Sequence, residues 1–295
     1  MITLDLTNKD KSDIKYEPIN YPDGQRDLVI NKESCYNIIP PPNSFKILSS
    51  HVKIKSRLNN AEDLLMIVCA TKALKNLKIQ YIHLYTPYIM GLRSDRLFQV
   101  GGNRYIKDVL APILNAQNFE SVTCIDAHSF VAENCINNLE VESNYNLVKF
   151  FFEDIKLVGL DYSNYVIISP DAGASHKIHK LSEKIGYKGD IITCSKERGI
   201  DGKLSDTNVP DFDYSKDIII IDDIFDFGGT FKNIVKAINK KIPESASIIG
   251  KKYLICTHSI QEEGLKDALK YFDTIYTTNS YKDFNIERIK QLNVF

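Results

Sequence analysis

Short runs of aliphatic and β-branched residues alternate along the chain with longer segments whose apolar residues recur every three or four positions. In the first half, residues 61–75 and 103–115 have the helical period, and the runs 79–85 and 121–125 predict strands. This alternation of strands and helices is typical of α/β units built on a parallel sheet.

The second half of the chain repeats the alternation. It predicts strands at 165–169, 190–194, 218–221, 253–257 and 274–277, and helices at 176–185, 229–240 and 261–271. Between the halves, residues 134–146 are polar, which favours a domain boundary there. We therefore expect an α/β fold of two tandem domains, 1–143 and 144–295, each a mostly parallel sheet flanked by helices. The last residues could pack back on the first domain.

Residues 195–215, between two of these strands, contain Gly, Asp, Lys and Pro but no apolar period. A long irregular connection inside a compact domain is typical of a mobile functional loop, and a surface insertion is the alternative.

Composition narrows the class of protein. The 37 Lys and Arg residues balance 38 Asp and Glu residues, so no basic excess indicates a nucleic-acid partner. The first residues are too polar for a signal peptide, and no apolar run is long enough to span a membrane. The six cysteines form no CxxC pair, which favours reduced thiols over a disulfide framework or a zinc site. We expect a cytoplasmic protein.

The stretch 218–231, IIIIDDIFDFGGTF, holds the most informative chemistry. Four isoleucines predict a strand buried on both faces, and ligands of open α/β sheets bind beyond the carboxyl ends of such strands. Asp222 and Asp223 could accept hydrogen bonds from the vicinal hydroxyls of a sugar or hold a cation. Gly228, Gly229 and Thr230 would expose backbone N–H groups to an anion at a helix N-terminus. The simpler alternative is a solvated acidic turn with a glycine-rich helix entry.

This loop, DDIFDFGGT, resembles the ribose-phosphate loop of the type I phosphoribosyltransferase and phosphoribosyl pyrophosphate (PRPP) synthetase superfamily. Other stretches resemble segments of the synthetases, also called ribose-phosphate pyrophosphokinases, in the same order along the chain. They are YPDGQ at 21–25, the helical stretch RLNNAEDLLMIVCATKAL at 57–74, YTPYIMGLRSDR at 85–96, CIDAHS at 124–129, VIISPDAGA at 166–174 and SKER at 195–198.

The resemblance implies two phosphoribosyltransferase-type domains, the first binding ATP and the second a ribose phosphate. It implies transfer of the β,γ-diphosphate of ATP to the anomeric 1-hydroxyl of a 5-phosphorylated ribose, with release of AMP. Ribose 5-phosphate, giving PRPP, is the default acceptor. The active site is expected between the domains, at the carboxyl ends of the strands.

The resemblance also implies roles for individual residues of the second domain. Asp222 and Asp223 would hold the ribose hydroxyls, directly or through a cation. The cradle of the 5-phosphate would consist of Asp226, Phe227, Gly228, Gly229 and Thr230. Lys196 and Arg198 would close over the transferring diphosphate and stabilise its charge, although on spacing alone SKERGIDGK is more typical of a solvated charge run.

The cofactor implied is Mg²⁺, anchored by His128 and Asp171, with a water-mediated contact expected from the imidazole. Asp126 would either support that site or cap a turn.

The nucleotide would contact residues of the first domain. Arg93, Ser94 and Arg96 would lie at the ATP phosphates with His128, and Ser94 replaces a longer glutamine of the family pattern. Tyr21, Asp23 and Gln25 would face the adenine. In the family that segment comes from a neighbouring subunit, so a homodimer or larger homo-oligomer is implied.

Phe227 departs from the family pattern, because Thr or Ser usually stands there and helps to bind a terminal 5-phosphate. One hypothesis turns Phe227 into the core, while backbone N–H groups still hold ribose 5-phosphate. The other is an acceptor whose 5-phosphate is substituted, such as ADP-ribose, with the ring packing on the extension. The product would then be ADP-ribose 1-pyrophosphate, a precursor for rebuilding NAD.

Two further classes remain open. A phosphoribosyltransferase that uses PRPP would share the 222–230 loop, but it would not need the N-terminal half with its RSDR and DAH segments. An inactive regulatory paralogue would keep the fold and lose loop or metal residues, and the presence of His128, Asp171, Lys196 and Arg198 argues against it.

Overall fold

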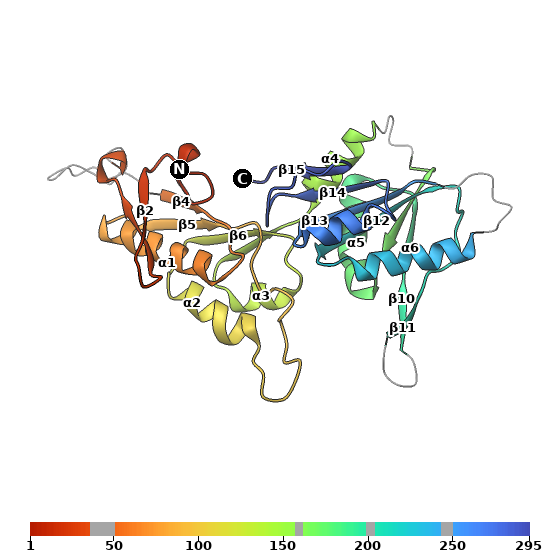
Figure 1. The fold of residues 1–295 in the computed structure, drawn as a ribbon, viewed down its shortest axis with the longest axis horizontal. Helices are drawn as coiled ribbons and strands as arrows, with labels where there is room; N and C mark the ends of the chain where they lie inside the picture. The colour runs from red at the N-terminus through yellow and green to blue at the C-terminus, as the bar shows by residue number, and fades with distance from the viewer. Residues whose placement is uncertain (36–50, 157–161, 199–203, 243–249) are drawn as a thin grey trace. The chain divides into compact units, whose positions relative to one another are not determined.

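The computed structural model describes residues 1–35, 51–156, 162–198, 204–242 and 250–295 (Figure 1). The chain divides into two compact units: unit 1 is Met1–Glu142 together with Phe295, and unit 2 is Ser143–Val294. No helix within these described ranges is long and apolar enough to cross a membrane. All six cysteines are free thiols.

Unit 1 has a five-stranded parallel sheet in the order β1-β4-β5-β6-β7, and the hairpin β2-β3 forms a separate antiparallel ribbon. Its strands are β1 (Ile2–Asp5), β2 (Tyr16–Asn20), β3 (Arg26–Ile30), β4 (His51–Lys55), β5 (Tyr81–Tyr85), β6 (Ser121–Ile125) and β7 (Leu139–Glu142). Its helices are η1 (Lys9–Lys11), η2 (Lys32–Cys35), α1 (Ala61–Asn76), the π-helical η3 (Tyr105–Leu110), α2 (Ala111–Asn115) and α3 (Phe130–Cys135).

The strands of this sheet follow one another in chain order. Because crossover connections between parallel strands are right-handed, such an order places the connecting helices on one face. Figure 1 shows α1, α2 and α3 on the same side of β4, β5 and β6. The strand residues that point to this side are buried aliphatics, among them Val52, Ile54, Ile82, Leu84 and Val122.

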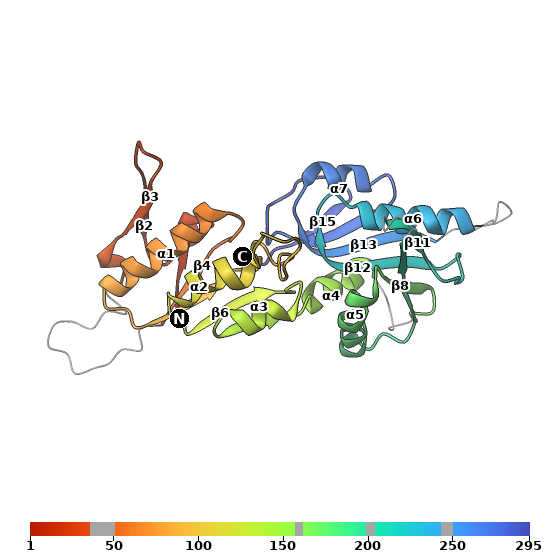
Figure 2. The same ribbon diagram turned by 90° about the horizontal axis from the view of Figure 1, so that it is seen from below.

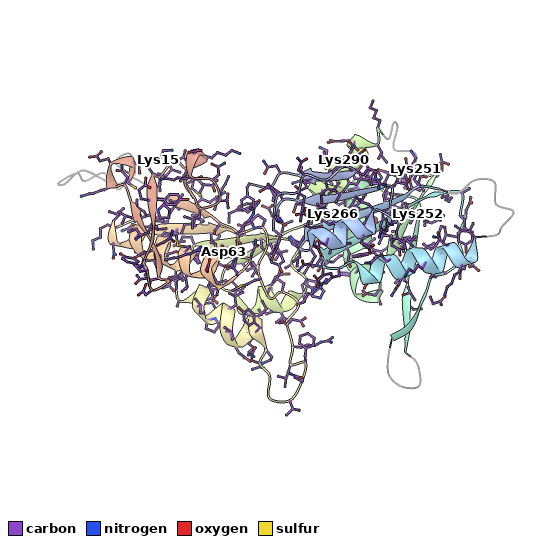
Figure 3. All side chains as sticks on the ribbon, viewed as in Figure 1. Lys15, Asp63, Lys251, Lys252, Lys266 and Lys290 are labelled. Atoms are coloured by element: carbon purple, nitrogen blue, oxygen red, sulfur yellow. The ribbon has the colours of Figure 1, made fainter. Side chains whose placement is uncertain are left out.

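Local signals explain where α1 begins. The Asn60 side chain caps the helix by accepting from the Asp63 N–H at 2.9 Å, and the Asp63 carboxylate accepts from the Asn59 N–H at 2.8 Å. The arrangement resembles a capping box, except that the carboxylate accepts from the residue before the N-cap; Figure 3 labels Asp63 in the first turn.

The prediction of a second helix in unit 1 was only partly correct. Instead of one α-helix over 103–115, a π-helical turn leads into α2. Pro112 has no N–H to continue the α-helical pattern, and the Ala111 N–H bonds to the Ile106 carbonyl, five residues back.

Unit 2 is a six-stranded parallel sheet in the order β15-β14-β13-β12-β8-β9, with the antiparallel hairpin β10-β11 beside it. Its strands are β8 (Tyr165–Ser169), β9 (Asp190–Thr193), β10 (Ser195–Arg198), β11 (Leu204–Asn208), β12 (Asp217–Phe225), β13 (Lys252–Ser259), β14 (Thr274–Thr278) and β15 (Ile289–Leu292). Its helices are α4 (Tyr145–Asp154), α5 (Ala172–Ile185), α6 (Gly229–Lys241) and α7 (Glu262–Ala268).

Both faces of this sheet are covered by helices, as Figure 2 shows for β12 and β13. Ile218 and Ile220 of β12 join the core under α6 and α7, whereas Ile219 and Ile221 join the core under α4 and α5. The continuous run of isoleucines is therefore explained, because successive strand residues point to opposite faces and both faces are buried under helices.

Two predictions for unit 2 need correction. The strand predicted at 218–221 extends to Phe225, because β12 keeps its pairing with β13 as far as Phe225 and Ser259. The segment predicted to be irregular forms the β10-β11 hairpin instead, whose tip lies outside the described residues. Its strands pair through the backbone, which requires no alternation of apolar side chains.

Candidate active site

The strand order of unit 2 contains a topological switch point between β8 and β12. From β8 the chain continues through α5 to β9 on one side, and from β12 it continues through α6 to β13 on the other. The crevice beyond the carboxyl ends of two such strands is the usual ligand site of an open α/β sheet.

Asp222 and Asp223 lie at this switch point, within β12 rather than after it. Pairing of β12 with β8 ends at Ile220 and Ile168, whereas on the other edge Asp222 is still level with Cys256 of β13. The two acids therefore lie in the part of β12 that no longer pairs with β8.

The two carboxyl groups have different surroundings. Asp223 is almost fully buried, and its Oδ2 lies 3.7 Å from Nζ of Lys177 on α5. Asp222 keeps part of its surface accessible, yet burial of its carboxyl group raises its pKa well above the ordinary value. The negative charges of Asp223 and Asp171 add to this shift of the Asp222 pKa. The site therefore concentrates negative charge that a cation would relieve.

Sequence reasoning missed Lys177. It lies six residues after Asp171, less than two turns into α5, and its pairing with Asp223 depends on α5 packing beside β12. The available signal was a lysine early in the helix that follows the Ser-Pro-Asp turn.

Asp171 joins this cluster from the end of β8. It is the N-cap of α5, where its Oδ1 accepts from the Ala174 N–H at 3.1 Å. A Cβ on Gly173 would lie 3.2 Å from the same oxygen, so glycine lets the backbone come close to the carboxylate.

The loop after β12 is shaped by two glycines with different roles. Gly228 has φ +75°, and a Cβ there would lie 2.5 Å from Cζ of the buried Phe225 ring. Gly229 is exposed, and a Cβ there would meet no heavy atom within 4 Å. Gly229 and Thr230 open the 13-residue helix α6, and open space lies beside this helix N-terminus, as an anion would require.

Phe227 is 61% exposed. The hypothesis that it turns into the core was therefore wrong. Phe225 fills that place instead, fully buried and stacked on Phe231 with 5.6 Å between ring centroids. Gly264 of α7 supports the loop from behind, because a Cβ there would lie 2.8 Å from the Asp226 carbonyl oxygen.

Lys196 and Arg198 occupy alternate positions of β10, in the hairpin that follows β9. Glu197 pairs with Asp206 and Arg198 with Leu204, so the register shifts by one residue at this point. The backbone of these strand residues is described, whereas the side chains of Lys196 and Arg198 lie outside the described part. Their proposed role in diphosphate transfer stays a prediction.

The remaining predicted residues belong to unit 1. Arg93 and Arg96 are exposed on the segment after β5, where the Arg96 guanidinium lies over the Phe98 ring, and Ser94 is partly exposed. His128 is exposed after β6, next to a buried Asp126 whose φ is +47°. These residues are presented to solvent, as nucleotide contacts would need.

Tyr21, Asp23 and Gln25 form the exposed tip of the β2-β3 hairpin. The Tyr21 N–H bonds to the Gln25 carbonyl at 2.9 Å, the Gln25 N–H bonds to the Asp23 carboxylate at 3.0 Å, and Gly24 has φ +90°. The hairpin carries them on an element separate from the segments after β5 and β6 that hold Arg93 and His128.

The fold and the acid-and-glycine loop at the switch point define an α/β protein with phosphoribosyltransferase-type domains. A crystal structure of phosphoribosylpyrophosphate synthetase from Mycobacterium smegmatis has the same fold, with a TM-score of 0.73 over 95% of this chain and 86% of that one, at 15% identity. No protein-family model matches the chain.

Curated relatives agree with this comparison. The chain is 26% identical over 229 residues to ribose-phosphate pyrophosphokinase 2 of Archaeoglobus fulgidus, covering 77% of this chain and 75% of the relative. It is 26% identical over 246 residues to ribose-phosphate pyrophosphokinase 1 of Streptococcus pneumoniae, covering 79% and 71%. The resemblance to the ribose-phosphate pyrophosphokinase family is thus confirmed.

Proposed function

We propose that this chain is a pyrophosphokinase that moves the β,γ-diphosphate of ATP to the anomeric hydroxyl of a 5-phosphorylated ribose. The anomeric oxygen forms a bond to the β-phosphorus, the bond from that phosphorus to the α,β-bridging oxygen breaks, and AMP leaves with the bridging oxygen. The hydroxyl proton passes to solvent. Ribose 5-phosphate is the default acceptor, and PRPP is then the product.

One observation carries this proposal: an acid pair and an open helix N-terminus follow one another along β12 and α6. Asp222 and Asp223 would accept hydrogen bonds from the 2- and 3-hydroxyls, and the N–H groups around Gly229 and Thr230 would bind the 5-phosphate. A ribose phosphate presents both partners within one small molecule. The similar proteins from Archaeoglobus fulgidus and Streptococcus pneumoniae are named ribose-phosphate pyrophosphokinases, which supports the same reaction.

Mg²⁺ fits the charge of the site. The Asp222 pKa is raised by burial and by the charges of Asp223 and Asp171, so the carboxyl cluster favours a cation. Mg²⁺ usually takes one or two carboxylates and completes its shell with water and substrate phosphates, so a dedicated protein cage is not required. Asp171 and His128 would hold the ion, which would neutralise charge on the ATP phosphates.

The protein's own groups do the rest of the work in this proposal. Arg93 and Arg96 would bind the ATP phosphates, and Lys196 and Arg198 would offset charge that develops on the transferring diphosphate. Tyr21, Asp23 and Gln25 would contact the adenine of a neighbouring subunit's ATP, which makes a homo-oligomer part of the proposal.

ADP-ribose is a second candidate acceptor, and the exposure of Phe227 favours it. An exposed phenyl ring in a phosphate loop offers a surface for the group that extends from a substituted 5-phosphate. The chemistry at the anomeric hydroxyl is the same for both acceptors.

The test is release of AMP from ATP and Mg²⁺ with ribose 5-phosphate or ADP-ribose offered separately, and products identified by mass. Turnover with ribose 5-phosphate alone supports the default acceptor, and turnover with ADP-ribose alone supports the second. Absence of AMP release with both acceptors, from protein whose thermal unfolding is cooperative, contradicts the proposed reaction.

Phe227→Thr refines the choice between the acceptors. If the ring packs on an extended acceptor, this variant loses ADP-ribose turnover and retains or gains turnover with ribose 5-phosphate. Equal effects on both acceptors would show that the ring does not distinguish them.

A further inference from the structure

Buried polar side chains gather at the carboxyl ends of β13 and β14. Before that point both strands are largely apolar, with Tyr253–Cys256 and Ile275–Tyr276 buried in the two cores of unit 2. At the ends every residue is polar and buried, and we name this set the edge network: Thr257, His258, Ser259, Thr277, Thr278, Asn279 and Ser280. Burying polar groups is unfavourable unless they are hydrogen-bonded, so their concentration at one edge of the sheet requires a reason.

The edge network lies beside the acid-bearing end of β12. Figure 1 shows β12, β13 and β14 side by side, and the residues of β12 and β13 that are level with one another are Asp222 with Cys256, Ile224 with His258 and Phe225 with Ser259. On its other edge β12 has already parted from β8, because that pairing ends at Ile220. The end of β12 therefore pairs with one strand, β13.

The end of β13 depends in turn on side chains. Backbone pairing of β13 with β14 ends at Cys256 and Thr277, three residues before β13 ends at Ser259. Beyond that point the Thr278 hydroxyl donates to the Thr257 carbonyl at 2.7 Å. Side-chain hydrogen bonds thus continue the connection where the backbone ladder stops.

Two further hydrogen bonds of the edge network join side chain to side chain. His258 Nδ1 lies 2.7 Å from Ser280 Oγ, and Ser259 Oγ lies 2.9 Å from Thr277 Oγ1. None of these side chains has exposed surface, so water does not compete for the bonds. Because hydrogen bonds fix direction as well as distance, they hold the end of β13 more exactly than apolar contacts would.

We propose that the edge network positions the loop of 222–230 for the acceptor, with Thr277 and Ser280 as positioning residues that act through β13. This inference rests on the proposed function, in which a 5-phosphorylated ribose contacts the acid pair and the N-terminus of α6 at once. The strand end that carries both must then keep a fixed place relative to the rest of the sheet, since small displacements of binding groups weaken binding and turnover.

The test uses the full chain and two variants. Ser280→Ala removes the hydroxyl next to His258, and Thr277→Val removes the hydroxyl next to Ser259 while keeping the shape of the side chain. Each should speed hydrogen exchange of the backbone amides of 222–226 about tenfold, followed by mass spectrometry. Each should also raise the KM for the acceptor about fivefold or more and leave the KM for ATP unchanged.

Ser182→Ala is the matched control. Ser182 is an equally buried hydroxyl of unit 2 that donates to the Ile178 carbonyl at 2.8 Å, and it lies about three turns along α5 from Asp171. Its loss should lower the unfolding temperature of unit 2 without changing exchange at 222–226 or the KM for the acceptor. Circular dichroism should show that all three variants are folded.

The outcomes separate this inference from the proposed reaction. Wild-type exchange at 222–226 in both Ser280→Ala and Thr277→Val overturns the inference, and so does an equal effect of Ser182→Ala. Faster exchange at 222–226 with an unchanged KM for the acceptor overturns it as well.

A second measurement needs no turnover, namely the protection of amides of 222–230 by added ribose 5-phosphate or ADP-ribose. A wild-type chain that releases no AMP but shows this protection, weakened in both variants, contradicts the reaction and supports the positioning role. A wild-type chain that neither releases AMP nor shows protection overturns both.

Discussion

Adjacent glycines at the start of α6 allow a paired test of the structure, by Gly228→Ala and Gly229→Ala. At Gly228 a methyl group meets two obstacles. The backbone is left-handed, which costs an L-residue about 1–2 kcal/mol. The new Cβ would also lie 2.5 Å from Cζ of Phe225, a ring with no exposed surface to move into.

The magnitude follows from these two terms. Overpacking a rigid core typically costs about 1–3 kcal/mol, so Gly228→Ala should destabilise unit 2 by roughly 2–5 kcal/mol. For a unit of this size, that is a fall in the unfolding temperature of roughly 4–20 °C. Gly229→Ala meets no atom within 4 Å and has no left-handed φ, so its stability should stay within about 0.5 kcal/mol of wild type.

Thermal unfolding followed by circular dichroism or calorimetry measures both variants. The Gly229→Ala methyl lies beside the helix N-terminus, so under the proposed function it should raise the KM for the phosphorylated acceptor while stability is retained. A Gly228→Ala variant as stable as Gly229→Ala would refute the loop conformation described above. A Gly229→Ala variant with normal stability and normal KM would refute the phosphate cradle while leaving the fold intact.

Three further substitutions test the charges of the site. Asp222→Asn should stabilise the ligand-free protein by about 0.5–2 kcal/mol, because it removes a desolvated charge, and under the proposed function it should abolish turnover. Since the folded protein raises the Asp222 pKa, wild-type stability should fall as pH rises from the ordinary carboxyl pKa toward the raised value, and denaturant unfolding of Asp222→Asn should lack this fall. Lys177→Met should destabilise unit 2 by about 1 kcal/mol and raise the KM for the acceptor, because Asp223 loses a cation that lies 3.7 Å away. An unchanged unfolding temperature and an unchanged KM would argue against this pairing. Lys196→Ala should lower kcat about a hundredfold or more with an unchanged unfolding temperature, and a lesser effect in single-turnover assays would remove Lys196 from the transfer step.

Much of unit 2 could be predicted because its signals are local. The four isoleucines require a strand buried on both faces, and β12 has that environment. The predicted β8 matches the observed strand, and α5 begins four residues earlier than predicted, at the Asp171 cap. The acids and glycines of 222–230 predict a ribose-phosphate loop by residue type and spacing, which are local signals, and that role stays a prediction.

Other features were decided only by tertiary structure. The length of β12 depends on its pairing with β13, the ion pair of Lys177 with Asp223 depends on α5 packing beside that strand, and the exposure of Phe227 depends on Phe225 filling the core in its place. The order of the strands in unit 1, which places the described connecting helices on one face of the sheet, likewise cannot be read from periodicity. The physical reason is common to all of them: sequence periodicity reports what one segment must bury, whereas pairing partners and the contacts of a given face arise between segments distant in the chain.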